Sequence, residues 1–394
     1  MTGVVWLDTT AIILAAMWLG RAVLTTLGAR ALLDLPAGDP TREPPGGWPR
    51  VSVVVPSQND ELDVRTSIDS LLAGDYPNLE VIAVDDRSTD RTGAILDEIA
   101  EKDQRVRAVH IRELPDGWIG KPHALLQGTL SSTGDWLLFT DADVRFRPAT
   151  LRKAVARAIE LRLDFFTLIP DSGAATVVMR AINVMSVGIA LLVSGQWMPW
   201  RRTWRFWFMG VGAFMLVRRE AYFRAGGHEK IRGRMVDDLS LGCLLSASGC
   251  RCDVGLSTEE LRVPYAARFG DLIRVTQKNC FAIFDFSWTR LISTNLMTVI
   301  FDFGAPLLPI VSWRLWPAAL VIWACIGVVY LSLARRVKAP AWSFLLHPLI
   351  SVLLFLPTWG SALATSRAGG VQWRETFYPL SMLKGRAAGR APGL

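Results

Sequence analysis

Hydrophobic residues follow two patterns along this chain, long uninterrupted runs near its ends and short runs in its middle. The N-terminal run, 11–27, is apolar apart from Arg21, and the C-terminal runs 315–333 and 344–365 contain no Asp, Glu, Lys or Arg. Each run has about the length that a helix needs to cross the hydrocarbon core of a bilayer. The pattern therefore predicts one N-terminal and at least two C-terminal transmembrane helices.

A further apolar stretch, 296–311, leaves the number of C-terminal spans open at two or three. It contains Asp302, Pro306 and Pro309. An ionisable residue inside a span is a candidate functional residue, but Asp302 is also compatible with a segment that does not cross. Three complete spans would put the basic tail, 367–394, outside the cell, against the cytoplasmic bias of Lys and Arg. Two spans with one re-entrant or interfacial segment would keep that tail inside.

The N-terminal run predicts an uncleaved anchor rather than a signal peptide. Asp8 precedes it without any Lys or Arg, and Arg30, Arg42 and Arg50 follow it. A signal peptide has the opposite charge order and ends at a small-residue cleavage site. We therefore expect a multi-pass protein of the cell (inner) membrane, with its N-terminus outside and its central domain in the cytoplasm.

The central part of the chain alternates between short apolar runs and polar stretches with helical periodicity. The apolar runs are rich in β-branched and aromatic residues and are bounded by Pro, Gly or Asp, as strands are. Such alternation predicts an α/β domain with a mostly parallel sheet that helices cover on both faces. The predicted strands are 51–55, 81–84, 106–111, 136–139 and 165–169, and the predicted helices are 61–72, 92–101, 123–130 and 150–161.

These patterns divide the chain into four parts. We expect an anchor and linker over 1–47, a cytoplasmic domain over 48–290, a transmembrane region over 291–366 and a basic tail over 367–394. Within the domain, 196–208 contains four Trp, two Phe and three Arg, which suits a segment at the membrane interface. The alternative is a Trp-rich loop of the core with solvated Arg.

Composition agrees with a folded membrane protein. Hydrophobic residues make up 51% of the 394 residues, which excludes a disordered or collagen-like chain. The net charge of +7 suits anionic lipid or a phosphate-bearing partner, and we expect no nucleic-acid partner. The five Cys give neither a disulfide framework nor a repeated zinc pattern, although Cys250 and Cys252 could form half of a metal site.

Acidic and polar residues follow the predicted strands, where the ligands of parallel sheets bind. Asn59 follows the first strand, Asp85 and Asp86 follow the second, and Asp141 and Asp143 follow the fourth. Neither the glycine pattern of dinucleotide-binding proteins nor that of P-loop proteins is present. Two carboxylates one residue apart can hold Mg²⁺ or Mn²⁺ against a diphosphate. A helix cap and turn is the alternative for that pair taken alone.

Taken in order, these motifs resemble those of the family-2 glycosyltransferases, which have a GT-A fold. The resemblance extends over about 50–286, and the likeness is greatest to the lipid-directed hopanoid-associated and carotenoid (diaponeurosporenoate-type) enzymes. The ceramide glucosyltransferases are more distant. The matching segments are VSVVVPSQND, LEVIAVDDRSTD, DGWIGKPHAL, WLLFTDADVRF and GAFMLVRREAYFRAGGHEKIRGRMVDDLSLG.

The resemblance implies a role for each of these residues. Asp238 would be the general base that deprotonates the acceptor hydroxyl, with Asp237 beside it, and helix capping is the competing explanation of this pair. Mg²⁺ or Mn²⁺ would be the cofactor. The remaining roles would be nucleoside binding by Pro56, Asn59, Asp85 and Asp86, phosphate or base binding by Lys121, ribose or metal binding by Asp141, and metal binding by Asp143.

The sequence also departs from the family pattern. Gln58 stands where an Arg is common, and Asp237 stands where the family has Glu. The Gln-x-x-Arg-Trp motif of processive synthases is absent, which implies transfer of a single sugar. Lys278, in the corresponding region, is a weak candidate for contacting phosphate or acceptor, with a surface Lys as the alternative. His228 is a weak acceptor candidate, with a structural His as the alternative.

We therefore expect an inverting, metal-dependent enzyme that moves a hexose from a nucleotide sugar, with a UDP-sugar favoured, to a membrane lipid hydroxyl. The Trp-Arg-Glu-Thr-Phe-Tyr segment, 373–378, only partly matches its counterpart in the family, and we expect no catalytic role for that tail. The alternatives are a polyprenyl-phosphate or surface-polysaccharide glycosyltransferase, a metal-dependent nucleotidyltransferase, and an inactive membrane scaffold with the same fold.

Overall fold

The computed structural model describes residues 2–35, 43–203, 205, 208–263, 268–277 and 279–387. The chain forms two compact units. We call them the helical unit (Met1–Leu32, Ala174–Pro199 and Ala266–Gly369) and the sheet unit (Leu33–Gly173, Trp200–Tyr265 and Gly370–Leu394). The chain therefore leaves the sheet unit after Gly173 and after Tyr265 and returns to it each time.

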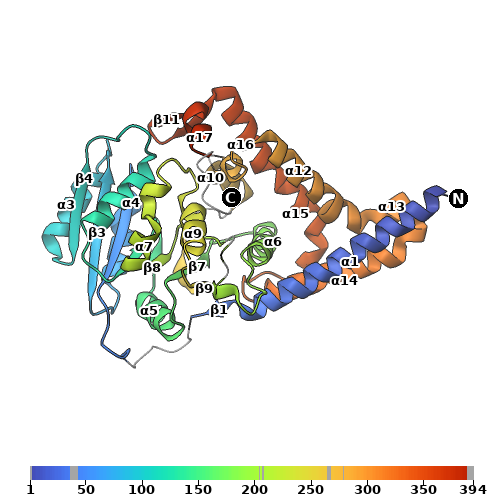
Figure 1. The fold of residues 1–394 in the computed structure, drawn as a ribbon, viewed down its shortest axis with the longest axis horizontal. Coiled ribbons are helices and arrows are strands. Elements are labelled where there is room, and N and C mark those ends of the chain that lie inside the picture. Colours follow the sequence, from blue (N-terminus) through green and yellow to red (C-terminus); the bar gives the residue numbers. More distant parts are fainter. Residues whose placement is uncertain are drawn as a thin grey trace. The chain divides into compact units, whose positions relative to one another are not determined.

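The sheet unit is built on a mixed, mostly parallel sheet (Figure 1). Its strands are ordered β1-β9-β7-β8-β5-β2-β3-β4, and β6 pairs with β9. The described strands are β1 Leu33–Asp34, β2 Val51–Ser57, β3 Leu79–Asp86, β4 Val106–Ile111, β5 Trp136–Phe139, β6 Arg145–Phe146, β7 Phe165–Asp171, β8 Met215–Arg218 and β9 Cys252–Arg262.

All five predicted strands are confirmed, as β2, β3, β4, β5 and β7. The residues of 51–55 are buried throughout, because a parallel strand covered on both faces needs an unbroken apolar run. The four predicted helices are also confirmed, as α2 Val64–Leu72, α3 Thr92–Lys102, α4 Gly120–Leu130 and α5 Thr150–Glu160. The pattern did not reveal β8, which lies antiparallel between β5 and β7, or β9.

Strand order places a switch point between β2 and β5. From β2 the chain builds β3 and then β4 on one side, and β5 then pairs with the other side of β2. Crevices at the carboxyl ends of strands on either side of such a reversal are the usual ligand sites of open α/β sheets. Here those ends are Ser57 and Phe139.

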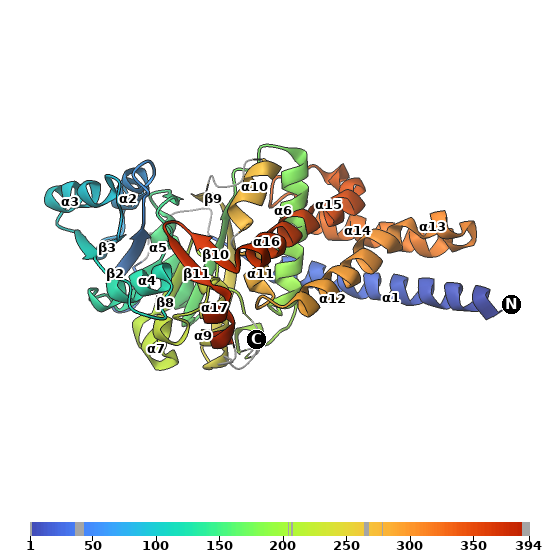
Figure 2. The same cartoon turned by 90° about the horizontal axis from the view of Figure 1, so that it is seen from above.

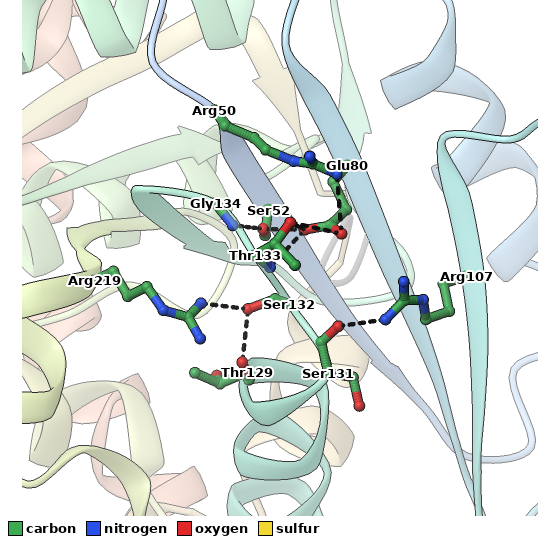
Figure 3. A network of polar contacts seen from close by, with 10 residues as sticks. All are labelled: Arg50, Ser52, Glu80, Arg107, Thr129, Ser131, Ser132, Thr133, Gly134 and Arg219. Carbon is green, nitrogen blue, oxygen red and sulfur yellow. Dashed lines mark hydrogen bonds and ion pairs between the residues drawn. The ribbon is translucent and has the colours of Figure 1, made fainter.

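A buried polar network ties the opposite ends of the same strands together (Figure 3). Glu80, only 6% exposed, accepts hydrogen bonds from the Ser52 hydroxyl and from the Thr133 backbone N–H and pairs with Arg50. Although burial opposes this, those hydrogen bonds and the Arg50 charge lower the pKa of Glu80. The network fixes the starts of β2, β3 and β5, and it lies at the sheet edge away from the acidic strand ends.

The helical unit contains four helices that are long and apolar enough to cross a membrane. They are Trp6–Ala31, Trp288–Val311, Trp313–Ala334 and Ala341–Ala368, so three of the four lie in the C-terminal part of the chain. In Figure 2, α1 (Thr2–Ala31) lies beside α14 (Trp316–Ala334), with which it packs. A shorter apolar helix, α6 (Val177–Val193), also belongs to this unit.

Asp302 is paired inside the helical unit. It lies on a π-helical turn, Val299–Gly304, and forms an ion pair with Arg21 of α1. The Arg21 guanidinium also lies over the Trp18 ring, 4.6 Å from its centroid. Asp302 therefore joins two segments about 280 residues apart in sequence, and that contact accounts for a charge within an apolar segment.

The aromatic segment 196–208 lies partly in the protein interior. Phe208 is fully buried, and the side chains of Arg201 and Arg202 turn to the buried carboxylate of Asp253. Trp200 is 60% exposed. Residues 204, 206 and 207 lie outside the described residues. The predicted interfacial position of this segment stays a prediction.

Candidate active site

The candidate site lies at the carboxyl ends of β2, β3 and β5, next to the first turns of α4 and α9 (Asp237–Ala247). Pro56 is the half-buried penultimate residue of β2, and the polar loop that ends in Asn59 and Asp60 follows it. Asn59 has φ +53°, a left-handed conformation that Asn tolerates better than most residues. Its side-chain oxygen accepts the Thr89 backbone N–H at 2.8 Å, so it connects the loops after β2 and β3.

Asp85 and Asp86 are buried at the end of β3, and each has a basic side chain as a partner. Asp85 accepts the Ser88 backbone N–H at 3.1 Å and contacts Nδ1 of His110 at 3.0 Å. The other His110 ring nitrogen contacts Asp97 at 2.9 Å, and the hydrogen bonds to these two carboxylates raise the pKa of His110. Asp86 accepts two hydrogen bonds from the guanidinium of Arg87.

Lys121, in the first turn of α4, lies among three carboxylates. Its ammonium is 2.6 Å from Asp141 Oδ1 and 3.5 Å from Asp237 Oδ2. Burial alone would lower the pKa of Lys121, but the charges of Asp141, Asp237 and Asp238 together raise it. Lys121 is therefore a fixed positive charge that joins the end of β5 to the start of α9.

Asp237 and Asp238 begin α9, as predicted, and differ in their surroundings. Asp238 Oδ2 accepts the Gly212 backbone N–H at 3.1 Å, and Oδ1 accepts that of Leu239 at 2.8 Å. Asp238 is half-buried, whereas Asp237 is 3% exposed. Burial raises the pKa of both carboxyls. Asp238 is thus a carboxylate held by backbone donors and open on one side.

The backbone at Gly212 lets the two acidic groups come together. A Cβ at this position would lie 3.1 Å from Asp141 Oδ2 and 3.5 Å from both Asp238 Oδ2 and Lys121 Nζ. The side chains of Asp141, Asp238 and Lys121 therefore converge on one point beside this glycine. Segments nearly 100 residues apart in sequence meet there.

Residues 52–222 match the family described as Glycosyl transferase family 2. Over these residues the chain is similar to the family-2 glycosyltransferases. The chain is 30% identical over 190 residues to YdaM, a probable glycosyltransferase of Bacillus subtilis. It is 31% identical over 236 residues to the beta-monoglucosyldiacylglycerol synthase of Synechocystis sp.. These matches cover 45% and 58% of this chain but 43% and 41% of the relatives, so the chain spans less than half of their length.

A solved structure with a similar fold is the mannosyltransferase PcManGT from Pyrobaculum calidifontis, in complex with GDP-Man and Mn²⁺. The TM-score is 0.52 at 22% identity, and the match covers 94% of this chain and 100% of that one. The likeness shows the fold, an α/β GT-A architecture. The predicted fold class is therefore confirmed.

The candidate site has carboxylates that suit a divalent cation whose remaining ligands would come from a diphosphate. Within the described ranges, no three His, Cys, Asp or Glu residues come together as a ready-made metal site. Asp143 Oδ1 is buried and accepts no hydrogen bond from the described residues. Burial and the neighbouring Asp141 charge raise the pKa of Asp143 to about 6. A cation bound by Asp141 and Asp143 would satisfy that oxygen, so these residues fit Mg²⁺ or Mn²⁺.

Of the two weaker candidates for acceptor or phosphate binding, the structure describes His228 but not Lys278. His228 is fully buried, with Nδ1 2.9 Å from the Tyr222 hydroxyl and its ring against Phe139. Burial and the Lys121 charge lower the pKa of His228 to about 3, so it is neutral. Its Nε2 is buried and makes no hydrogen bond with the described residues, and its acceptor role stays a prediction. Lys278 lies outside the described residues.

Some residues that the fold brings to the candidate site were not among those predicted from the sequence. His110, in the middle of an unremarkable strand pattern, holds Asp85. Residues of the C-terminal hairpin β10 (Gly370–Trp373) and β11 (Thr376–Pro379) contact the loops after β2 and β3. The partial family motif at 373–378 was the one available signal for the hairpin.

Proposed function

We propose that this chain transfers a single hexose from a nucleotide sugar, with a UDP-sugar favoured, to a hydroxyl of a membrane lipid. The observation that carries the proposal is the convergence of Asp141, Asp238 and Lys121 at the switch point of a family-2 domain. The chemistry is assigned to residues 48–290, and the segments 1–47 and 291–366 hold the domain at the membrane where lipid acceptors are found. The domain lies on the cytoplasmic side, where nucleotide sugars are present.

The reaction is a single displacement that inverts the anomeric carbon. Asp238 accepts the proton of the acceptor hydroxyl, whose oxygen attacks the anomeric carbon as the bond to the diphosphate oxygen breaks. The raised pKa of Asp238 makes its carboxylate a stronger base than an exposed Asp. Backbone donors from Gly212 and Leu239 hold the carboxylate in place during the transfer.

The donor is bound by the other acidic loops. Asn59, Asp85 and Asp86 lie on the nucleoside side of the site, and Lys121 lies toward the diphosphate. A divalent cation on Asp141 and Asp143, when bound, neutralises charge on the departing nucleoside diphosphate. Asp237 positions Lys121 through its ion pair and remains buried.

A lipid acceptor is supported by two observations. Four helices are long and apolar enough to cross a membrane, and a relative carries the name beta-monoglucosyldiacylglycerol synthase. The acids at the site argue against an inactive scaffold, because Asp143 Oδ1 is buried and accepts no hydrogen bond from the described residues.

The deciding experiment measures nucleoside diphosphate release by the detergent-solubilised enzyme. UDP- and GDP-sugars are supplied with Mn²⁺ or Mg²⁺, with and without total membrane lipid. We expect release that requires both the cation and the lipid, and a glycolipid product. Release with a polyprenyl phosphate alone would move the acceptor to that class, and pyrophosphate release would identify a nucleotidyltransferase. A folded enzyme that releases nothing with any donor would contradict the proposal.

A further inference from the structure

The C-terminal hairpin Gly370–Pro379 contacts all three loops on the nucleoside side of the candidate site. The first loop follows β2, the second follows β3, and the third leads into α4, whose first residue is Gly120. The hairpin belongs to the same unit as these loops, although it lies about 300 residues beyond the first two in sequence. Its contacts are Arg374 Nη2 to Asp60 Oδ1 (2.6 Å), Arg374 Nη1 to the Asn59 carbonyl (3.1 Å), Asn59 Nδ2 to Glu375 Oε1 (3.0 Å), Thr89 Oγ1 to Glu375 Oε1 (2.9 Å), Arg87 Nη1 to Thr376 Oγ1 (3.3 Å) and the Gly120 N–H to the Tyr378 hydroxyl (3.0 Å).

Unfavourable backbone conformations are concentrated at this contact. The backbone φ angles of Asn59, Arg87 and Arg374 are 53°, 59° and 53°. These values lie in the left-handed region, which residues other than glycine rarely adopt. Such conformations persist only where the surroundings fix them. Each of the three residues hydrogen-bonds across the hairpin–loop contact. Together with the hydrogen bonds within and between the two loops, the hairpin therefore holds the backbone of the loops that would bind a nucleoside.

The hairpin also holds the point where the nucleoside loops meet Lys121. The Tyr378 hydroxyl accepts the N–H of Gly120, and Gly120 lies tightly packed against Asp86 and Arg87. A Cβ on Gly120 would lie 2.5 Å from Asp86 Oδ2 and 2.9 Å from Arg87 Nη2. Tyr378 is buried at 4% exposure, so this contact is the anchored end of the hairpin.

Arg374 and Glu375, in contrast, contribute little to global stability. Both are exposed at the turn of the hairpin, and exposed ion pairs and hydrogen bonds stabilise proteins only weakly. The polar groups they engage, the Asn59 amide and the Thr89 hydroxyl, lie in the loops that carry the predicted nucleoside contacts. What these two residues fix is the arrangement of those loops.

We propose that Arg374 and Glu375 are positioning residues of the donor site, which hold the loops after β2 and β3 in the arrangement that binds the nucleoside diphosphate. The inference rests on the proposed function. It assigns a donor-binding role to a hairpin that follows the last apolar helix of the chain. The donor site in the N-terminal half of the sheet unit is therefore complete only after the C-terminal hairpin has folded against it.

The test uses the full-length enzyme in detergent and measures binding of UDP and GDP by calorimetry in the presence of Mn²⁺. For whichever nucleotide the wild type binds, we expect Glu375→Ala and Arg374→Ala to raise Kd roughly 5- to 10-fold. The KM for the donor should rise in parallel, and kcat at saturating donor should change less than about threefold, as for lost ground-state binding. Glu375→Gln keeps an acceptor oxygen for Asn59 and Thr89, so its Kd should stay within about twofold of the wild type.

The control is Glu101→Ala, which removes an exposed glutamate at the end of α3, away from the hairpin. It should leave Kd, kcat and the melting temperature unchanged. Unchanged Kd in both Glu375→Ala and Arg374→Ala would overturn the inference alone, as would a loss of binding that follows a large fall in melting temperature. A wild type that neither binds nor releases a nucleoside diphosphate would instead contradict the proposed function, and the inference would fall with it.

Discussion

Two adjacent carboxylates at the start of α9 have different surroundings, and so we expect different roles. Asp238 accepts two backbone N–H groups and is half-buried, so its remaining lone pairs can reach a substrate. Asp237 is nearly inaccessible and pairs with Lys121. The difference between neighbouring residues follows from the helix geometry, because successive side chains of a helix point about 100° apart.

Asp238→Asn should therefore abolish transfer without abolishing donor binding. The amide keeps one oxygen, for one of the two backbone donors, but cannot accept the proton of the acceptor. We expect turnover to fall by about 10²- to 10⁴-fold. The measurement is nucleoside diphosphate release beside the Kd for that nucleotide, which should stay within about twofold. Near-normal turnover in a folded Asp238→Asn enzyme would remove the general-base assignment.

His110 makes stability depend on pH near neutrality. Hydrogen bonds to Asp85 and Asp97 raise its pKa in the folded protein above the ordinary value of about 6.5. A raised pKa gives stabilisation that is fully present below pH 6.5 and is lost as pH rises through the folded value. Because His110 and Asp97 are partly exposed, the contribution is about 1 kcal/mol or less.

The check is the melting temperature of the wild type and of His110→Gln between pH 6 and pH 9. The wild type should lose a few degrees relative to the variant as pH rises. Any pH dependence from other groups is shared by both proteins and cancels in the difference. A difference that is flat with pH, or that grows with rising pH, would contradict the assignment.

At the scale of elements, α9 can place Asp238 only because glycines let it approach the loop that leads into β8. A Cβ on Gly242 would lie 2.4 Å from the backbone N of Gly210 and 2.7 Å from the carbonyl carbon of Met209. Backbone atoms cannot move aside as a flexible side chain can. The helix itself would have to shift, and Asp238 would shift with it.

Gly242→Ala should accordingly destabilise the enzyme and reduce turnover together. Overpacking of this kind costs about 1–3 kcal/mol, and a displacement of about 1 Å at a catalytic group can cost on the order of 100-fold in rate. Gly360→Ala is the matched control, because a Cβ there meets nothing within 4 Å. Thermal melting and nucleoside diphosphate release measure both effects. Equal behaviour of the two variants would show that α9 has room to adjust.

The elements that sequence could predict are those whose signal is local. The run 51–55 is apolar because the strand is buried on both faces, and α5 alternates by helical period, so both were found. β8 was missed because it is only four residues long, and β9 because its sequence, CDVGLSTEELR, contains polar and acidic residues along its length. The candidate acids could be chosen from the sequence because ligands bind at the carboxyl ends of parallel strands. The His110–Asp85 contact, in contrast, depends on the register of two strands. No local pattern encodes that register.

At the scale of the whole molecule, the fold restricts how the chain can cross a membrane. The hairpin Gly370–Pro379 packs with the loops after β2 and β3, so both lie on the same side. We therefore predict an even number of crossings between 266 and 369. The same reasoning applies to 174–199, which leaves and returns to the sheet unit, so we expect that α6 does not cross.

Three long apolar helices lie between 266 and 369 in the described part of the chain, and so we expect that one of them does not cross completely. We assign that behaviour to Ala341–Ala368, because it is broken at Leu354 into α15 (His347–Leu353) and α16 (Phe355–Ala368). Trp288–Val311 and Trp313–Ala334 are separated by a single residue, and we predict that they form a crossing pair. This keeps the basic tail beside the sheet unit, in agreement with the charge bias.

Cysteine labelling tests this topology directly, because all five native cysteines are buried. Arg314→Cys reports on the turn between the crossing pair, and Lys384→Cys and Glu101→Cys report on the tail and the sheet unit; all three positions are exposed. In intact cells a membrane-impermeant maleimide should label Arg314→Cys alone, since the N-terminal anchor puts the sheet unit in the cytoplasm. Opening the membrane should expose the other two sites together. Labelling of Lys384→Cys in intact cells while Glu101→Cys stays protected would require an odd number of crossings, and the hairpin could then not pack on the donor loops.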